Sequence, residues 1–470
     1  MKEYLNITRD MLDFIEKSPS CFHAIENAKQ ILGAVGYVEL KETQDWKLVP
    51  GGRYYVTRNA SSMIAFSVPE LLRQLEKVSN ETDEQMVEVA QLQMDGAGKK
   101  HALSESGKQE DVERISGFHI VASHSDSPCF KIKEAPEMLV EEKYLKLNTE
   151  KYGGMILSTW LDRPLSVAGR LVVLEEKGFV TKLVNIDKDL LVIPNVAIHM
   201  NRDMNKGVEY NPQIDMLPLF ADTSEGWGKG NLLKLVAEAA GVDPETVLGQ
   251  DLFLYTHEKG RILGGSEEFV LSPRLDDLQC VYASLRALTE SVPEKYINVC
   301  AIFDNEEVGS GTRQGADSTF LEDTLFRIAE GLGVGRTGFL QWIADSFLIS
   351  ADNAHAVHPN HPEKSDPTNR PYLNGGIVIK YHGSQKYTTD AVSAAKMKQI
   401  CERAKVPCQA YANRSDVLGG STLGNISTAH VSVASVDIGL PQLAMHSAVE
   451  TAGARDTEYA VKALKVFWDE

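Results

Sequence analysis

The sequence predicts an α/β fold with a mostly parallel, mixed sheet flanked by helices, and a β-rich segment inserted into it. Two observations carry this prediction. From Ser272 onward, short apolar runs alternate with helical patterns, which is the rhythm of βαβ units. Between residues 130 and 270, strand-like runs follow one another and turn residues separate them. We therefore expect one domain formed by residues 1–129 together with 271–470, and an inserted domain formed by residues 130–270.

The first hundred residues supply helices, two strands and a polar stretch. Residues 5–36 predict two helices, because apolar residues from Met11 to Ile15 form a stripe and Ser18-Pro19-Ser20 then offers a break and a new cap. Residues 53–67 alternate as strands do. The polar stretch 79–117 predicts a surface excursion with a short helix near residues 84–93, and its role stays open.

The remaining elements follow in order. Residues 118–122 form a buried-type strand that runs into His124. Within the insert, strands are predicted at 145–147, 169–174, 179–184, 190–193 and 251–255, with a helix at 232–240. Beyond it, strands are predicted at 296–303, 347–351, 376–381 and 431–438, and helices near 319–330, 390–404 and 456–468.

Charge and composition exclude several classes of partner. The formal net charge of −18 argues against nucleic acids and anionic membranes, since both require a positive surface. There is no run of eighteen apolar residues and no signal pattern at the start, so we expect a cytoplasmic protein. The six cysteines are dispersed without a Cys-x-x-Cys pair, which predicts buried free thiols in a reducing compartment.

Five short segments each contain a metal-type ligand, and most of them follow an apolar β-type run. An α/β sheet places such residues along one edge, at the carboxyl ends of its strands. Two imidazoles and several carboxylates suit a carboxylate-bridged pair of zinc ions with open positions for water. We therefore predict a co-catalytic metallohydrolase. The segments are His124-Ser-Asp126, Leu275-Asp276-Asp277, Asp304-Asn-Glu306-Glu307, Ser350-Ala-Asp352 and Met445-His446-Ser447.

Glu306 and Glu307 are the most informative pair. If they leave a strand, adjacent side chains point in opposite directions, so one carboxylate can bind a metal while the other reaches a bound water. A metal-activated water needs a base to take its proton. The alternative is an acidic solvated loop, which the small-residue turn Val308-Gly309-Ser310-Gly311 makes less attractive.

The other candidates each have a simpler alternative. Asp126 can accept the second N–H of His124 and fix its tautomer, although a lone His-x-Asp is often a surface turn. Asp276-Asp277 could merely cap the following helix. Asp352 could be a turn residue and His446 a core histidine, and residues 355–361 hold three histidines that suit either a loop beside the site or a separate zinc site.

Taken together in this order, the segments resemble the M18 metallopeptidases, the aspartyl-aminopeptidase-like enzymes, in a bacterial-type form. The likeness runs through most of the chain. It rests on His124-Ser-Asp126-Ser-Pro-Cys129, Pro273-Arg-Leu-Asp276, Asp304-Asn-Glu-Glu307-Val-Gly-Ser310, Ser350-Ala-Asp352-Asn-Ala-His355-Ala-Val-His358, Gln442-Leu-Ala-Met-His446-Ser447, Ser18-Pro-Ser-Cys-Phe-His23-Ala24 and Thr159-Trp-Leu-Asp162-Arg163.

The resemblance implies two zinc ions per chain, with cobalt or manganese as possible substitutes. His124 and Asp352 would hold one ion, Glu307 and His446 the other, and Asp276 would bridge both. Glu306 would be the general base and then the acid, and Asp126 the partner of His124. Asp277 stands where the family often has Asn, so whether Asp276 or Asp277 bridges stays open.

The resemblance also implies an assembly. The inserted β-rich domain would form dimers, and the dimers a tetrahedral dodecamer that encloses the active sites. The histidine at 199 would reach a neighbour's active site and help to stabilise the transition state, whereas His199 read alone predicts a core histidine.

The expected reaction is removal of the N-terminal residue from peptides by attack of a metal-activated water. Lys380 and His355 are the candidate substrate-binding residues. Lys380 would either favour acidic N-terminal residues or bind something shared by all substrates. The alternatives are a dinuclear zinc carboxypeptidase or deacylase, and a non-catalytic shell-forming assembly protein.

Overall fold

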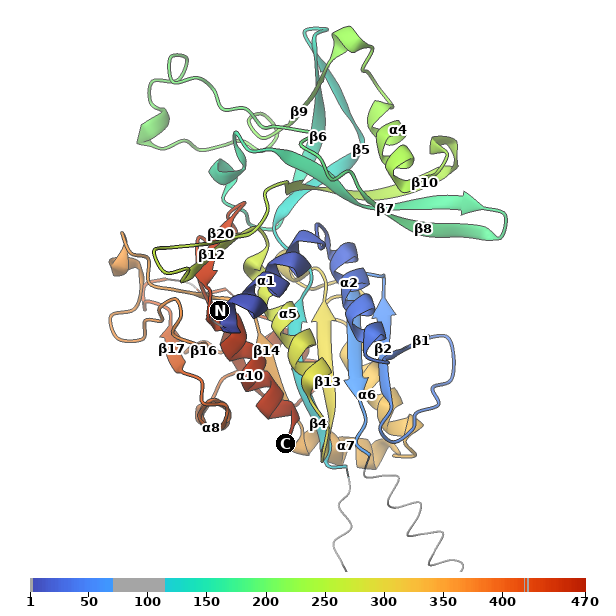
Figure 1. The fold of residues 1–470 in the computed structure, drawn as a ribbon, viewed down its shortest axis with the longest axis vertical. Coiled ribbons are helices and arrows are strands. Elements are labelled where there is room, and N and C mark those ends of the chain that lie inside the picture. The colour runs from blue at the N-terminus through green and yellow to red at the C-terminus, as the bar shows by residue number, and fades with distance from the viewer. Residues whose placement is uncertain (1–2, 71–114, 418, 421) are drawn as a thin grey trace, which may run out of the picture.

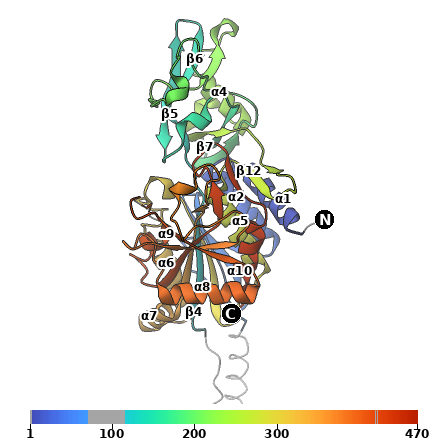
Figure 2. The same ribbon diagram turned by 90° about the vertical axis from the view of Figure 1, so that its left-hand side faces the viewer.

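The computed structural model describes residues 3–70, 115–417, 419–420 and 422–470. An α/β layer forms one part of the molecule and a β-rich part stands above it, so that the chain is elongated (Figures 1 and 2). The helix predicted near residues 84–93 lies outside the described residues, as does the polar stretch up to residue 114.

A nine-stranded mixed sheet forms the centre of the α/β layer, and most of its neighbouring strands are parallel, which confirms the predicted fold class. Its middle strands are β13, β4 and β14, side by side in that order. Strands β3, β4, β13 and β14 are buried almost throughout, as expected for strands covered on both faces. The sheet order is β1 (Val38–Leu40), β2 (Arg53–Arg58), β3 (Ser62–Ser67), β13 (Tyr296–Phe303), β4 (Gly117–His124), β14 (Phe347–Ala351), β18 (Ala434–Gly439), β16 (Ile377–Tyr381) and β17 (Cys408–Ala412).

Helices cover both faces of this sheet. One face carries α1 (Glu3–Glu16), α2 (Cys21–Ala34), α5 (Leu275–Glu290), α8 (Ala391–Ala404) and α10 (Asp456–Trp468). The other carries α6 (Phe320–Gly331), α7 (Arg336–Asp345) and α9 (Leu423–Ser427).

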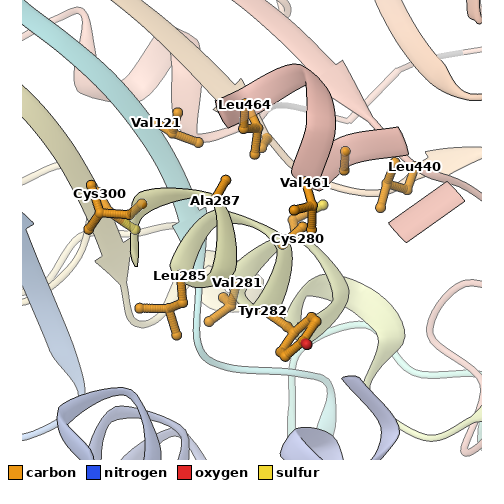
Figure 3. Close-up of a cluster of buried hydrophobic side chains, with 14 of the residues drawn as sticks. Val121, Cys280, Val281, Tyr282, Leu285, Ala287, Cys300, Leu440, Val461 and Leu464 are labelled. Atoms are coloured by element: carbon orange, nitrogen blue, oxygen red, sulfur yellow. The ribbon is translucent and has the colours of Figure 1, made fainter. Parts of the chain in front are cut away.

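Helix α5 is buried on nearly all sides because it packs against the central sheet and against helices α1, α2 and α10. Cys280 and Ala287 lie on the side of α5 that faces Val461 and Leu464 of α10, whereas Val281 and Leu285 point from the opposite side of the helix (Figure 3). A helix that is apolar all round is expected in such a place. Its first turn is irregular, since Asp276 and Asp277 have non-helical backbone angles and are joined by a cis peptide bond.

The β-rich part is built on an antiparallel six-stranded sheet. Its inward side chains, among them Phe130, Leu252 and Leu254, form a separate hydrophobic core with Trp160. Helix α4 (Asn231–Ala240) packs on this sheet near β8. The sheet order is β8 (Gly178–Asn185), β7 (Leu165–Glu175), β10 (Val247–Thr256), β5 (Cys129–Val140), β6 (Tyr144–Tyr152) and β9 (Leu219–Asp222).

A third, five-stranded sheet was not predicted, and it brings distant segments together beside the central sheet. It combines short strands from three regions of the chain, so that residues 269–272, 441–453 and 354–355 become neighbours. The sheet order is β11 (Arg261–Leu263), β12 (Phe269–Ser272), β20 (Glu450–Gly453), β19 (Pro441–Leu443) and β15 (Ala354–His355).

Two sequence expectations concern the chain as a whole. Among the described residues, no helix has both the length and the apolar character needed to cross a membrane. All six cysteines are free, as predicted, but only Cys280, Cys300 and Cys401 are buried. Cys21 and Cys129 are half-buried, and Cys408 is exposed on the edge strand β17, so the expectation of burial is wrong for these three.

Candidate metal centre

The five predicted segments converge on one place at the carboxyl ends of the central strands. His124 is the last residue of β4, and Asp304 and Asp352 follow directly after β13 and β14, its two neighbours. Asp276 and His446 reach the same place from the small sheet, since they follow β12 and β19. Parallel strands end at a common edge, so side chains that are far apart in sequence meet there.

Asp276 lies between the two imidazoles. Its Oδ1 is 3.4 Å from Nε2 of His124, and its Oδ2 is 3.6 Å from Nε2 of His446. Its carboxylate is therefore shared by two groups of ligand atoms. Asp277 is fully buried beside it, and its Oδ2 accepts a hydrogen bond from the backbone N–H of His124 at 3.1 Å.

The remaining ligand candidates divide between the two sides of Asp276. On one side, Asp352 Oδ1 is 3.8 Å from His124 Nε2. On the other, Glu307 Oε2 is 3.4 Å from His446 Nε2. Ligand atoms of these sets lie within 4.8 Å of one another, a spacing that could hold a metal ion on each side.

The second ring nitrogen of each histidine is held by a backbone carbonyl. Nδ1 of His124 donates to the carbonyl of Asp126 at 3.1 Å, and Nδ1 of His446 donates to the carbonyl of Gly154 at 2.9 Å. In the neutral ring this arrangement places the lone pair on Nε2, which faces the carboxylates, and this is the tautomer that a metal ligand needs. The carboxylate of Asp126, expected to accept the bond from His124, is farther away at 3.5 Å.

Glu306 and Glu307 lie in a 3-10 turn (Glu306–Val308) and not on a strand, so the expectation that they point in opposite directions is wrong. Both carboxylates lie within 4.8 Å of a ring nitrogen of His124. Burial, and then the nearby carboxylate of Asp352, raise the pKa of Glu306 to about 8. Such a pKa suits a group that takes up and returns a proton near neutral pH.

The chemistry of this donor set fits divalent metal ions. Three buried carboxylate oxygens of this cluster have no hydrogen-bond partner among the described residues: Asp276 Oδ1, Asp277 Oδ1 and Glu307 Oε1. Burial and the neighbouring Asp276 raise the pKa of Glu307 far above its usual value. Crowded carboxylates that lack donors are costly by themselves, and a divalent cation would remove that cost.

Lys380 and His355 border the same centre in different ways. Lys380 is buried, and its Nζ donates to Asp352 Oδ2 at 3.3 Å. Burial alone would raise the pKa of Asp352, but Lys380 and His124 hold it well below its usual value. His355 is exposed on β15, with its ring 6.0 Å from that of Tyr411. No group of candidate ligands in the described ranges contains His358 or His361.

His199 is not part of this centre within its own chain. It lies in an exposed segment of the β-rich part, next to Ile198 and Met200, whose side chains are also exposed. The interpretation of His199 alone as a core histidine is therefore wrong.

Two residues of the centre gave no signal in the sequence. Glu450 accepts hydrogen bonds from the backbone N–H groups of Asp276 at 3.0 Å and His446 at 2.7 Å. The hydroxyl of Tyr152 donates to Asp126 at 2.7 Å. Tyr152 is 26 positions from Asp126, and Glu450 is 174 positions from Asp276, so no local pattern reveals these two contacts.

Comparison with known proteins yields one family. The sequence model of the aminopeptidase I zinc metalloproteases (M18) matches residues 14–89 and 105–468. Curated relatives include a probable M18 family aminopeptidase 2 of Clostridium novyi, 46% identical, and one of Clostridium acetobutylicum, 44% identical. Each of these alignments covers 100% of both chains.

Solved structures agree. The chain is 34% identical to the protein in a cryo-EM structure of an Ape4 and Nbr1 complex, covering 100% of this chain and 87% of that one with a TM-score of 0.87. It is 31% identical to Chaetomium thermophilum mApe1, covering 99% and 98% with a TM-score of 0.83. A Saccharomyces mApe1 dodecamer shares the fold at 24% identity, covering 99% and 97% with a TM-score of 0.80.

Proposed function

This chain belongs to the M18 family of zinc metallo-aminopeptidases, and from this and the geometry of its candidate metal centre we propose a dinuclear zinc enzyme that removes N-terminal residues from peptides. In this proposal His124 and Asp352 would hold one zinc ion, Glu307 and His446 would hold the other, and Asp276 would be shared by both. The observation that carries it is the position of Asp276, whose two oxygens each face a different imidazole. The same observation favours Asp276 over Asp277 as the bridge. Cobalt or manganese would suit the same ligands.

Glu306 is the proposed proton carrier. When bound, zinc would supply Lewis acidity toward the peptide carbonyl and would lower the pKa of a bound water. The carboxylate of Glu306 would take a proton from the attacking water and later return it to the leaving amine. Its position beside His124, among the proposed ligands, supports this role. Asp126 would orient His124 and the turn that carries Glu306.

The preference for one N-terminal residue over another would depend on the surroundings of Lys380. Two preferences remain, one for acidic residues and one broad or neutral. The hydrogen bond from buried Lys380 to Asp352 favours a role shared by all substrates, because it commits the ammonium group to a proposed zinc ligand. Exposed His355 would contact the substrate at the edge of the site.

We also propose that the chain forms a homo-oligomer, with residues 130–270 as the dimerisation domain and dimers assembling into a tetrahedral dodecamer. The solved dodecamer of a relative supports this proposal, as do the exposed apolar side chains of Val196, Ile198 and Met200 in the β-rich part. In that arrangement the partner subunit's His199 would approach the active site and help to stabilise the oxyanion. Light scattering on purified protein tests it, since a mass equal to the 51.8 kDa of one chain would contradict it.

The decisive experiment measures hydrolysis of a panel of aminoacyl chromogenic substrates by zinc-loaded protein. We expect Glu306→Gln to lower kcat by a factor of about 10²–10⁴ while its zinc content stays unchanged. A chelated sample should be inactive. Glu294→Gln is the matched control, because Glu294 is exposed and precedes β13 at the opposite end of that strand from the site. If two zinc ions bind per chain and no substrate is hydrolysed, the proposed metal centre is supported and the proposed reaction is contradicted.

A further inference from the structure

We propose that the segment Tyr152–Ile156, at the end of β6 in the β-rich part, positions the metal centre, with Tyr152 as a positioning residue for the turn that carries Glu306 and Glu307. This inference rests on the proposed function, since it concerns the residues that would hold zinc and move the proton. It gives the β-rich part a role in the active site of its own chain, in addition to dimerisation.

Asp126 is the residue through which Tyr152 acts. One of its carboxylate oxygens accepts the backbone N–H of Glu306 and the other that of Glu307, each at 3.2 Å. Its backbone carbonyl accepts Nδ1 of His124 at 3.1 Å. The orientation of Asp126 therefore sets the position of the proposed base and of two proposed zinc ligands.

Tyr152 holds the carboxylate of Asp126 in that orientation. Its hydroxyl donates to Asp126 Oδ2 at 2.7 Å and accepts from Asn305 Nδ2 at 2.8 Å. Asn305 immediately precedes Glu306 and has a left-handed backbone with φ of 63°. The tyrosine thus binds both the carboxylate beneath the turn and the residue that starts the turn.

The environment of Tyr152 keeps its hydroxyl in place as a donor. Its ring packs edge-on against Phe253 of β10, with ring centroids 5.7 Å apart. Burial and the carboxylate of Asp126 raise the pKa of Tyr152 far above its usual value, so the hydroxyl stays protonated at neutral pH.

The next residues of the segment contact the other side of the centre. The carbonyl of Gly154 accepts Nδ1 of His446, and the N–H of Ile156 donates to the carbonyl of His446, both at 2.9 Å. Gly153 has φ of +79°, and a Cβ atom there would lie 3.1 Å from Cβ of Glu307. The segment therefore passes close to Glu307 and fixes the ring of His446, the two proposed ligands of one zinc ion.

The test compares Tyr152→Phe with Tyr255→Phe in the full-length protein. Both changes remove one hydrogen-bonded hydroxyl from the same sheet, and that of Tyr255 donates at 2.7 Å to Asn185 Oδ1, which is not a proposed ligand. We expect Tyr152→Phe to lower kcat about 10–100-fold with KM changed less than twofold, and to weaken zinc binding in a chelator competition by a similar factor. Tyr255→Phe should match wild type in kcat and in zinc affinity.

Zinc affinity is measured without substrate, so failures of the two proposals are distinguishable. If wild type binds zinc but cleaves no peptide, the proposed reaction fails, and the zinc affinities still decide the role of Tyr152. If Tyr152→Phe binds zinc as wild type does and keeps its kcat, the inference is overturned. Equal losses in both variants would also overturn it, because they would reflect a general cost of removing a buried hydroxyl. Thermal unfolding of each variant verifies that it is folded.

Discussion

Three carboxylates at the border of the metal centre bind backbone N–H groups of the residues they position. Asp126 binds those of Glu306 and Glu307, and Asp277 binds that of His124. Glu450 binds those of Asp276 and His446. The three carboxylates thus orient the proposed ligands through the backbone N–H groups of those ligands. Loss of such hydrogen bonds around a metal site commonly lowers metal affinity or activity about 10–100-fold.

The two neighbouring aspartates should differ in their effect on zinc content. Asp276→Asn should leave at most one zinc ion per chain, because each oxygen of Asp276 faces a different imidazole. Asp277→Asn should retain two, since an amide oxygen can still accept the N–H of His124. Elemental analysis after dialysis measures this. The reverse pattern would assign the bridge to Asp277.

Replacement of Lys380 distinguishes its two possible roles. Lys380→Met should lower kcat/KM by a similar factor for acidic and neutral N-terminal residues, because it removes the donor that orients Asp352. The panel of chromogenic substrates measures this ratio directly. A loss confined to acidic substrates would show instead that Lys380 selects the side chain.

At the level of elements, the order of the central strands decides where the site forms. Strands β13, β4 and β14 are neighbours, so the residues that follow them meet at one edge. Helix α5 fixes the position of Asp276 and Asp277, because its buried side chains pack against α10 and the sheet (Figure 3). The tight packing of this helix therefore supports the geometry of the carboxylates at its start.

Loss of packing in α5 should be costly. Leu285 is 1% exposed, and Leu285→Ala should lower the free energy of unfolding by about 2–5 kcal/mol, since it leaves a cavity as well as removing buried methyl groups. Leu340→Ala in α7 is the control, because Leu340 is 53% exposed and should cost less than about 0.5 kcal/mol. Urea denaturation measures both, and equal effects would contradict the packing described for α5.

At the scale of the whole molecule, buried carboxylates connect segments that are far apart in the chain. Asp456, at the start of α10, accepts the backbone N–H groups of Asn374 and Gly376 at 2.7 and 2.9 Å. It is fully buried, and burial raises the pKa of its carboxyl to about 7. The ionisation of the Asp456 carboxyl therefore affects the stability of the fold, in addition to the hydrogen bonds that it accepts.

The effect of Asp456 on stability should depend on pH. An unfolded aspartate ionises near pH 4 and this one near pH 7, so between these values the folded chain holds the extra proton. The contribution of this group to stability therefore falls as pH rises from about 4 to about 7. Asp456→Asn should make the slope of unfolding free energy against pH less negative by up to about 1.4 kcal/mol per unit in that range.

Urea denaturation of metal-free protein at several pH values checks this, with Asp45→Asn as control because Asp45 is exposed. An unchanged slope in Asp456→Asn would show that its carboxyl titrates at an ordinary pH.

Local patterns in the sequence were sufficient for most of the fold. Strands such as β13 and helices such as α10 carry long apolar repeats, and they lie within a few residues of their predicted positions. Helix α7 and strand β17 were not predicted. In α7 only Phe339 and Ile343 are buried, and in β17 only Tyr411, so neither has a recognisable period.

For the candidate site, the sequence alone determined which residue types end the strands and hence the five segments that carry the proposed ligands. Only the tertiary structure decided that Asp276 faces both imidazoles, that Glu306 and Glu307 converge in a 3-10 turn, and that Tyr152 and Glu450 support them. The physical reason is the distance along the chain over which each feature acts. Strand ends and apolar periods are local properties of the chain, whereas these contacts join residues up to 174 positions apart and exist only after the sheets have assembled.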